Sequence, residues 1–353
     1  MTHLWVRAEQ RENEERVGLT PKGAAALLSA GIQVTVEESR CRAIPIAGYR
    51  AAGARIAPEN SWPSAPSDAI IFGLKELPED GTALRHSHIM FGHAYKGQPA
   101  GQILLERFRA GGGTLYDLEY LVDESGRRVA AFGYWAGFAG AAIALHCWLA
   151  QQADEIAGPV ATSPSADAFV EGLRARLGAT PLPTAIVIGA LGRVGSGATD
   201  LYVRLGMPVT KWDMADTAHG GPFPEILAHD IFLNCILAAP GCPVFVPSGA
   251  TTSERRLTVI GDIACDPTSD FSPIKVYDRT TTWGAPALRV HKSPPLDVMA
   301  IDNLPSLLPV EASEDYAAQL LPSLLTLGRF ETGVWARAQA EFERHTMGRG
   351  YAT

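Results

Sequence analysis

The sequence of 353 residues is poor in cysteine, and its cysteines lack the spacing of a metal site or a redox pair. They are odd in number, scattered, and without a CxxC or Cys/His pattern, which indicates free thiols in a reducing compartment. The five cysteines are Cys41, Cys147, Cys235, Cys242 and Cys265. We therefore predict neither a disulfide framework nor a bound metal.

The sequence also lacks an excess of positive charge. The formal net charge is -8 at pH 7, and no run of Lys or Arg occurs. This balance argues against nucleic acid and against an anionic membrane surface as partners. The first ten residues already carry charges and contain no apolar stretch of the signal-peptide kind. Together these absences predict a soluble, cytoplasmic protein.

A stretch without charge needs a separate explanation. Residues 130–150 contain no Asp, Glu, Lys or Arg, and their length alone would suffice to span a membrane. However, the stretch is rich in Ala and Gly, contains His146, and lacks the Leu, Ile and Val density of a membrane span. We predict instead a helix buried on nearly all sides, in which small residues allow close packing.

The length of the chain makes two domains the expectation. Short apolar runs alternate with helix-compatible segments, which is typical of largely parallel, doubly wound α/β sheets. Strands are expected at 4–6, 32–37, 68–73, 87–92, 114–116 and 129–132, and then at 186–188, 207–212, 229–237, 257–263 and 287–290. From Leu304 onward the apolar spacing becomes helical, and we expect this C-terminal piece to pack back on the first domain.

A glycine-rich turn follows the apolar run at 186–188. Gly189, Gly192 and Gly195 are spaced G-x-x-G-x-x-G, and a helix-compatible segment begins at Ala198. Glycine lets the backbone approach a pyrophosphate closely, and the N–H groups and dipole of a helix N-terminus favour the anion. The spacing departs from the common G-x-G-x-x-G, and an ordinary tight turn between a strand and a helix has the same composition.

Asp213 supports the dinucleotide interpretation of this turn. It stands at the end of the next apolar run, roughly 20 residues further on, where a carboxylate can accept hydrogen bonds from ribose hydroxyls. The same carboxylate would repel a 2′-phosphate, so the sequence favours NAD over NADP as the cofactor. The alternative interpretation is that Asp213 is a simple turn residue.

Three titratable residues follow three different predicted strands in the first 130 residues. Lys75, His93 and Glu119 each stand just beyond the end of a strand. In parallel sheets ligands bind at the carboxyl ends of the strands, so we expect these side chains to converge there. Singly, each could be an exposed lysine, a core histidine or a surface carboxylate, but together they predict a catalytic site.

Several long and unusual blocks stand along this sequence. They are Arg7-Ala8-Glu9 with Arg11, Glu14, Arg16 and Leu19-Thr20-Pro21, then Gly73-Leu74-Lys75-Glu76, residues 113–119, 126–133, 189–193 and 302–309, and Glu311-Ala312-Ser313. Together they resemble the NAD-dependent, lysine-forming saccharopine dehydrogenases, whose wider relatives are alanine dehydrogenase and the nicotinamide transhydrogenase subunit, and the resemblance runs nearly from end to end. It implies oxidation of saccharopine at the glutamyl Cα–N bond with NAD, followed by hydrolysis to lysine and 2-oxoglutarate.

The resemblance also implies roles for individual residues. Lys75 and His93 would form the acid/base pair, whose pKa values proximity and burial can draw toward neutrality while Glu76 and Glu119 oppose that shift. Arg16 and Arg128 would bind substrate carboxylates. The other candidate substrate-binding residues are Glu76, Lys96, Glu119 and Arg11, the last standing where the family commonly has a lysine. The candidate cofactor-binding residues are Gly189, Gly192, Arg193, Gly195, Asp213 and Asp302.

The sequence thus predicts an α/β protein with two doubly wound, Rossmann-like domains of mostly parallel sheets and an active site in the cleft between them. We expect residues 1–132 plus 309–353 to form the substrate domain and residues 133–308 to bind NAD. The expected partners are small molecules, namely saccharopine, or lysine and 2-oxoglutarate, and the expected assembly is a monomer or a small homo-oligomer. The alternatives are a related amino-acid or opine dehydrogenase, such as one acting on alanine, and a non-catalytic NAD(H)-binding protein.

Overall fold

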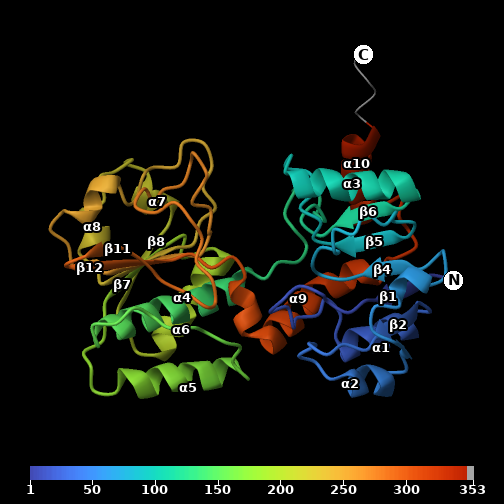
Figure 1. The fold of residues 1–353 in the computed structure, drawn as a ribbon, viewed down its shortest axis with the longest axis horizontal. Helices are drawn as coiled ribbons and strands as arrows, with labels where there is room; N and C mark the ends of the chain where they lie inside the picture. Colours follow the sequence, from blue (N-terminus) through green and yellow to red (C-terminus); the bar gives the residue numbers. More distant parts are fainter. Residues whose placement is uncertain (348–353) are drawn as a thin grey trace, which may run out of the picture. The chain divides into compact units, whose positions relative to one another are not determined.

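The structure is a computed structural model that describes residues 1–347. The chain divides into two compact units, one formed by residues 1–131 with the segment that starts at Pro309, the other by residues 132–308. Each unit contains one six-stranded sheet (Figure 1). The predicted α/β class with two mostly parallel sheets is confirmed.

The sheet of the first unit is entirely parallel, with strand order β3-β2-β1-β4-β5-β6. Its strands are β1 His3–Val6, β2 Gln33–Glu37, β3 Arg55–Ala57, β4 Ile70–Phe72, β5 Ser87–Met90 and β6 Thr114–Asp117. The chain runs outward from β1 in one direction and then returns to start β4 on its other side. The neighbours β1 and β4 therefore form the topological switch point, where ligands bind in such folds.

The predicted strand at residues 129–132 is wrong. This segment forms no strand of the sheet, because a turn at Gly126 folds it back on residues 121–122. Val129 N donates to Leu121 O at 3.0 Å, and Arg128 forms an isolated antiparallel bridge with Val122. The sixth strand is instead β3, which begins with Arg55 and contains no run of apolar residues like that of β4.

The helices of the first unit cover its sheet, and the C-terminal helices belong to this unit (Figure 1). They are α1 Pro21–Ser29, α2 Ile46–Ala51, α3 Pro99–Gly111, α9 Pro309–Leu324 and α10 Gly333–Met347, with a 3-10 turn η1 at Trp62–Ser64. Thr20 caps α1 by accepting from Gly23 N at 3.2 Å. A buried hydrogen bond from Val17 N to Ser313 Oγ, 2.9 Å long, ties α9 to the chain that leaves β1.

The sheet of the second unit has the order β11-β12-β10-β9-β7-β8 and is parallel except for β11. Its strands are β7 Ala185–Ile188, β8 Val209–Trp212, β9 Ile231–Asn234, β10 Val259–Asp262, β11 Leu288–Lys292 and β12 Pro295–Met299. The strand predicted at 287–290 is β11, an antiparallel edge strand. Its partner β12 was missed because Asp297 interrupts the apolar run, and this buried carboxylate is neutralised by Arg289.

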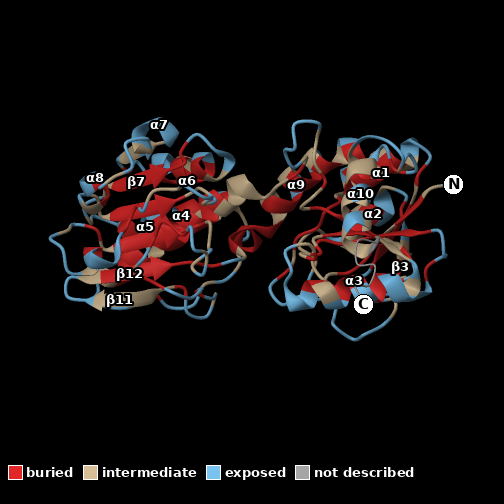
Figure 2. Cartoon of the chain, turned by 90° about the horizontal axis from the view of Figure 1, so that it is seen from above, coloured by how far each residue is buried: buried red, intermediate tan, exposed pale blue. Residues whose placement is uncertain are grey.

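The charge-free segment forms α4 (Gly133–Gln151), a helix buried along most of its length, as predicted (Figure 2). The other helices of this unit are α5 Ala166–Leu177, α6 Arg193–Arg204, α7 Met214–Thr217 and α8 Pro224–Leu227, with 3-10 turns η2 Ser248–Thr251 and η3 Leu304–Leu307. Glycines allow α4 and α6 to touch backbone to backbone, since a Cβ on Gly137 would lie 1.7 Å from Val194 O. Among the described residues, no helix is long and apolar enough to cross a membrane.

Candidate active site

The structure places Lys75, His93 and Glu119 beyond the carboxyl ends of the adjacent parallel strands β4, β5 and β6. The ends of neighbouring parallel strands share one edge of the sheet, as the sequence argument assumed. Glu119 joins two of the candidates directly. Its Oε2 lies 3.5 Å from His93 Nδ1, and its Oε1 lies 2.9 Å from Lys96 Nζ.

Glu119 is held in the ionised form by these partners. The hydrogen bond from His93 is the largest cause that lowers its pKa, burial opposes the shift, and Lys96 adds to it, so that the pKa falls to about 2. The carboxylate therefore stays negative across the physiological range and fixes a histidine and an ammonium group on either side of itself.

His93 adopts an unusual backbone conformation. Its φ is +48°, in the left-handed region that non-glycine residues seldom occupy. Its ring stacks on Phe91 with centroids 6.2 Å apart and an interplanar angle of 17°. Local strain of this kind is retained where the surroundings dictate one conformation, often at functional positions. Here it directs the imidazole toward Glu119.

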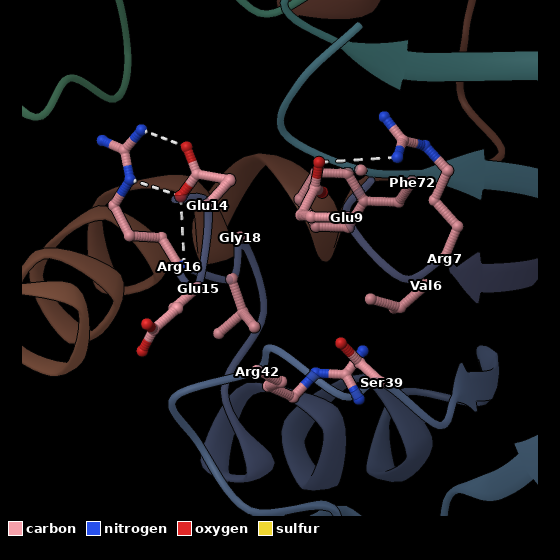
Figure 3. A pocket seen from close by; sticks show the side chains of 12 residues that line it. Val6, Arg7, Glu9, Glu14, Glu15, Arg16, Gly18, Ser39, Arg42 and Phe72 are labelled. Atoms are coloured by element: carbon pink, nitrogen blue, oxygen red, sulfur yellow. Dashed lines mark hydrogen bonds and ion pairs between the residues drawn. The ribbon is translucent and has the colours of Figure 1, made fainter. Parts of the chain in front are cut away.

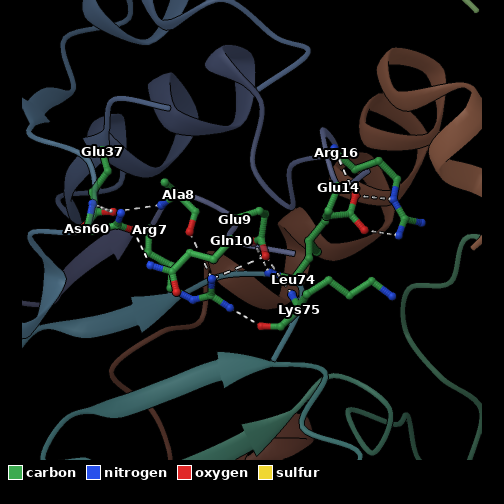
Figure 4. A network of polar contacts seen from close by, with 10 residues as sticks. All are labelled: Arg7, Ala8, Glu9, Gln10, Glu14, Arg16, Glu37, Asn60, Leu74 and Lys75. Carbon is green, nitrogen blue, oxygen red and sulfur yellow. Dashed lines mark hydrogen bonds and ion pairs between the residues drawn. The ribbon is translucent and has the colours of Figure 1, made fainter. Parts of the chain in front are cut away.

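Lys75 is partly buried beside charges of both signs. Burial is the largest cause that lowers the pKa of its ammonium, Arg16 and Arg11 add to the lowering, and Glu14 and Glu76 oppose it. The net direction is downward, which agrees with the expectation from sequence. Within residues 1–347, no carboxylate lies within ion-pair distance of Lys75 Nζ, and Figure 4 shows its side chain extending past Glu14 and Arg16.

Arg16 forms a buried bidentate pair with Glu14. Arg16 Nε donates to Glu14 Oε1 at 2.7 Å, and Nη2 donates to Oε2 at 2.5 Å (Figure 3). Burial works to raise the pKa of Glu14, but Arg16 and, more weakly, Lys75 outweigh it, so the pKa is lowered. The sequence argument assigned Arg16 to substrate carboxylates and assigned no site role to Glu14. The acidic residue two positions before Arg16 was the available indication.

The charged loop after β1 surrounds only a small hollow. Its volume is about 10 Å³, which is about the room for one water molecule. It is lined by Arg7, Glu9, Glu14, Arg16 and Arg42, among others (Figure 3). These charges therefore hold one another in place. A larger cavity of about 160 Å³ adjoins His93 and Glu76 and extends to the N-terminus of α3 at Gln98 and Ala100.

The remaining substrate candidates lie nearer the surface. Arg11 Nη1 is 3.6 Å from Glu76 Oε1, and both side chains are substantially exposed. Arg128 is exposed on the turn after β6. Arg128 and Arg16 both act on the buried hydroxyl of Tyr316 on α9, whose pKa is raised mainly by burial and lowered by the two arginines.

The glycine turn in the second unit has the geometry that a pyrophosphate needs. Gly189 has φ +84°, and a Cβ there would lie 2.5 Å from Ile236 Cγ2. A Cβ on Gly195 would lie 2.1 Å from Gly189 O. Gly192 is the N-cap of α6 and offers no side-chain cap, so the amides of the first turn can face an anion.

The predicted start of the helix at Ala198 is wrong, because α6 begins at Arg193. Gly195 and Gly197 thus lie inside the helix, where close contacts with Gly189 and with α4 exclude larger side chains. Arg193, the first helical residue, is exposed at this terminus.

Asp213 lies beside the glycine turn. Its Oδ2 accepts from Leu191 N at 3.2 Å, and its Oδ1 accepts from Met214 N at 2.7 Å. Asp216 Oδ2 accepts from Asp213 N at 2.8 Å and completes a capping box on α7. A carboxylate fixed at this distance from the turn fits the role of a ribose acceptor.

Two further features of this sheet edge are present. Asp302 follows β12 and lies near Cys265, where burial first and the Asp302 carboxylate second raise the pKa of the thiol to about 12. Leu191, Met214 and Leu237 are 82%, 83% and 75% exposed, although they are large and apolar, and they follow β7, β8 and β9. These apolar residues were not among the site residues predicted from the sequence. Exposed leucines and methionines give no distinctive pattern in a sequence.

Two buried carboxylates at the sheet edges were not among the predicted site residues. Asp117 ends β6 and is fully buried, and burial raises its pKa to about 6. Asp262 ends β10, accepts from Asn234 Nδ2 at 2.9 Å and from Tyr277 Oη, and burial raises its pKa. Within residues 1–347, no cluster of three or more His, Cys, Asp and Glu side chains is arranged to hold a metal ion.

Comparisons with known proteins agree with this arrangement. The family model described as "Alanine dehydrogenase/PNT, N-terminal domain" matches residues 5–139. The saccharopine dehydrogenase (NAD(+), L-lysine-forming) of Yarrowia lipolytica is 46% identical, with 98% of this chain and 97% of that protein covered. The enzyme of the same name from Candida albicans is 45% identical, with 97% and 96% covered. A solved L-alanine dehydrogenase has the same fold, with a TM-score of 0.69, 17% identity, and 98% and 99% coverage.

Proposed function

The chain belongs to the family of NAD(+)-dependent, L-lysine-forming saccharopine dehydrogenases, and we infer that it interconverts saccharopine with L-lysine and 2-oxoglutarate. It is an oxidoreductase that acts on a CH–NH bond with NAD as cofactor. The observation that carries this conclusion is the identity of about 45% over nearly the whole of both chains, in relatives that share this name.

We propose that the second unit binds NAD at the glycine turn. The amides at the start of α6 would hold the pyrophosphate, with Gly189, Gly192 and Gly195 allowing its approach and Arg193 near it. Asp213 would accept the ribose hydroxyls, and Asp302 would lie on the nicotinamide side. The exposed side chains of Leu191 and Met214 would cover the adenine ring. When bound, NAD(+) accepts a hydride from the glutamyl Cα of saccharopine.

We propose that Lys75 and His93 move the protons of the reaction. A deprotonated secondary amine is needed before hydride can leave, so one of the two must act as a base. Water then adds to the resulting imine, and the carbinolamine collapses to lysine and 2-oxoglutarate, which requires further proton transfers. The lowered pKa of Lys75 and the position of the His93 imidazole, 3.5 Å from the Glu119 carboxylate, support these roles.

We propose that the remaining charged residues bind and orient the substrate. Saccharopine carries three carboxylates, and Arg16 and Arg128 have the planar guanidinium groups that bind carboxylates in bidentate geometry. Glu14 holds Arg16 in place for this contact. Arg11, Glu76, Lys96 and Glu119 would complete the charged surroundings. The cytoplasmic location, the absence of nucleic-acid partners and the monomeric or small homo-oligomeric state stay predictions.

The substrate assignment is tested most simply in the reductive direction. Oxidation of NADH is followed with lysine and 2-oxoglutarate together, with each alone, and with pyruvate and ammonia. We expect turnover only when lysine and 2-oxoglutarate are both present. Turnover with pyruvate and ammonia alone would favour the alanine dehydrogenase alternative, and NADH binding without any turnover would favour the non-catalytic one.

The acid/base roles are tested by the double substitution of Lys75→Met and His93→Gln. Each group is expected to contribute roughly 10²- to 10⁴-fold to the rate, so the double variant should lose nearly all turnover. NADH affinity, measured by fluorescence, should stay at the wild-type value because neither residue lies at the glycine turn. Turnover near the wild-type rate in the double variant would remove both residues from the mechanism.

A further inference from the structure

A buried ion pair follows β1 and contacts the backbone of the proposed catalytic lysine. Arg7 Nη1 lies 3.4 Å from Glu9 Oε2, and the two side chains are 1% and 9% exposed. The carboxylate of Glu9 faces two consecutive amides beyond the end of β4. Its Oε1 accepts from Leu74 N at 2.6 Å, and its Oε2 accepts from Lys75 N at 3.0 Å.

Arg7 completes this contact from the other side of the same residue. Its Nη2 donates to the carbonyl oxygen of Lys75, and its Nη1 donates to Ala8 O at 3.1 Å (Figure 4). The N–H and the C=O of Lys75 are therefore both bound by one ion pair. A single side chain would leave the peptide free to rotate about one hydrogen bond, whereas this pair fixes both ends of the residue.

Gly73 makes the approach of Arg7 possible. A Cβ at Gly73 would lie 2.4 Å from Arg7 Cζ, so any other residue would displace the guanidinium. Arg7 N also donates to Phe72 O at 2.9 Å, which continues the pairing of β1 with β4. The contact thus lies directly at the switch point of the sheet, where the two strands diverge and a ligand binds.

Stability alone gives a weak reason for this arrangement. Burying an ion pair costs desolvation energy that its attraction often fails to recover. Within the described residues, Arg7 Nε is buried without a hydrogen-bond partner, which adds to that cost. Apart from the contact between Arg7 and Glu9 themselves, most hydrogen bonds of these two side chains go to the backbone of residues 74 and 75. The benefit that can be identified is therefore that the pair fixes the position of this backbone.

We propose that Arg7 and Glu9 are positioning residues that clamp the peptide of Lys75 and so hold its ammonium group in the reactive position. The catalytic meaning of this clamp rests on the proposed function, whereas the fixing of Lys75 does not. The groups that act on the ammonium are Glu14 and Arg16, Arg11 and Glu76. If the clamp is loosened, the lysine can move away from these groups toward solvent, and its titration returns toward that of an ordinary lysine.

Two variants with different chemistry test the clamp. Glu9→Gln keeps the size of the side chain but replaces one acceptor with a donor, which then faces an N–H group. Arg7→Lys keeps the positive charge but removes the forked guanidinium, whose Nη1 contacts Glu9 while its Nη2 donates to Lys75 O. The matched control is Asp297→Asn, which breaks another buried carboxylate–arginine pair, with Arg289, in the other unit.

The decisive readout is the titration of Lys75 in the protein without substrate. The chain contains only six lysines, so ¹³C-methylated lysine signals can be resolved by NMR, and the signal missing from Lys75→Met identifies Lys75. We expect the titration midpoint of Lys75 to rise by at least about 0.5 pH unit in both variants. Removal of the Glu9 charge by itself would lower the midpoint, so a rise in Glu9→Gln marks lost positioning.

Activity supplies the second readout. We expect kcat/KM with saccharopine, corrected for the folded fraction, to fall about 10- to 100-fold in both variants, with unchanged NAD affinity. The Asp297→Asn control should lose stability and keep both kcat/KM and the Lys75 titration. If Arg7 and Glu9 only stabilised the fold, activity would fall in proportion to the folded fraction and the titration midpoint of Lys75 would not change.

These measurements test the clamp and the proposed function separately. An unchanged Lys75 midpoint in whichever of the two variants folds, with kcat/KM within about threefold of wild type, would overturn the clamp. If the wild-type protein does not turn over saccharopine but the midpoint still rises in the variants, the proposed function fails and the clamp stands.

Discussion

At the scale of single residues, Asp117 and Glu119 show how partners decide the protonation of two carboxyl groups at one strand end. Asp117 is fully buried, and burial raises its pKa to about 6, although Glu119 N donates to its Oδ1 at 2.9 Å. Its Oδ2 is buried without a hydrogen-bond partner among the described residues. Glu119 has His93 and Lys96 as partners, and its pKa is lowered instead. Deep burial sets the direction for Asp117, whereas cationic partners outweigh burial for Glu119.

Asp117→Asn is predicted to stabilise the protein at neutral pH. The unfolded chain releases the Asp117 proton near pH 4, whereas the folded protein keeps it until about pH 6. Stability therefore falls as pH rises through this interval and stays lower above it. Asparagine keeps an acceptor for Glu119 N and removes this loss. We expect a gain of roughly 2–3 kcal/mol at pH 7.5 and little gain at pH 4, measured by urea unfolding.

Glu119→Gln provides the contrast of opposite sign. Its carboxylate has a lowered pKa, so it stabilises the folded state above the ordinary pKa of glutamate and loses this effect as pH falls toward 2. The variant should be less stable than wild type at pH 7.5, with the difference shrinking on acidification. If both substitutions changed stability in the same direction at pH 7.5, the assigned electrostatics of this strand end would be wrong.

Asp213→Ala is predicted to weaken NAD binding and to reduce the preference for NAD over NADP. The substitution removes the ribose acceptor and the negative charge that opposes a 2′-phosphate, so we expect a loss of about 10-fold or more in NAD affinity. Fluorescence titration with NADH and NADPH measures both effects. Asp216→Ala serves as the control, because it removes the hydrogen bond that Asp213 N donates to Asp216 Oδ2 and keeps the Asp213 carboxylate. Equal affinities in wild type and Asp213→Ala would contradict the ribose assignment.

Sequence reasoning found the residues whose placement follows from strand order. Lys75, His93 and Glu119 could be brought together because the ends of parallel strands share an edge. Contacts made by neighbouring charges in a loop could not be predicted, since every pairing of Arg7, Glu9, Glu14 and Arg16 was open. The folded loop pairs Glu14 with Arg16 and turns Glu9 toward the backbone of Lys75.

At the scale of the secondary-structure elements, segments with a clear apolar or charge-free pattern were predictable and the others were not. The helix α4 followed from its uncharged, small-residue composition, and the short strand β4 followed from its three consecutive apolar residues. The strand β3 begins with Arg55 and β12 carries a buried Asp297, so neither shows the apolar pattern on which prediction depends. The segment at 129–132 forms a backbone hydrogen bond across a turn, from Val129 N to Leu121 O, and joins no sheet.

The contact between α4 and α6 predicts a severe effect of a small substitution. A Cβ on Gly197 of α6 would lie 1.9 Å from Tyr134 O in α4, and backbone cannot withdraw as a flexible side chain can. Gly197→Ala should therefore destabilise the protein by at least about 2 kcal/mol and weaken NADH binding by shifting the N-terminus of α6. Thermal unfolding and fluorescence titration measure the two effects.

Gly172→Ala is the matched control for this prediction. Gly172 also lies inside a helix, α5, and nothing lies within 4 Å of a Cβ placed there. The exchange should stabilise the protein by about 0.5–1 kcal/mol through helix propensity alone. Equal effects of the two substitutions would show that α4 and α6 are not in the close contact described.

At the scale of the whole molecule, two sheets of different chemistry are joined in one chain. One sheet carries acidic, basic and imidazole groups beyond β1, β4, β5 and β6, and the other carries a glycine turn beyond β7 and Asp213 beyond β8. A proton-transfer site and a cofactor site are both required for the oxidation of a secondary amine with NAD.

The central claim is tested most directly by the product stoichiometry of the oxidative reaction. Purified protein is incubated with saccharopine and NAD(+), and NADH, lysine and 2-oxoglutarate are quantified together. We predict equimolar formation of all three, with no reaction when NADP(+) replaces NAD(+) at the same concentration. NADH formation without lysine, or no NADH formation in protein that binds NAD, would contradict the account.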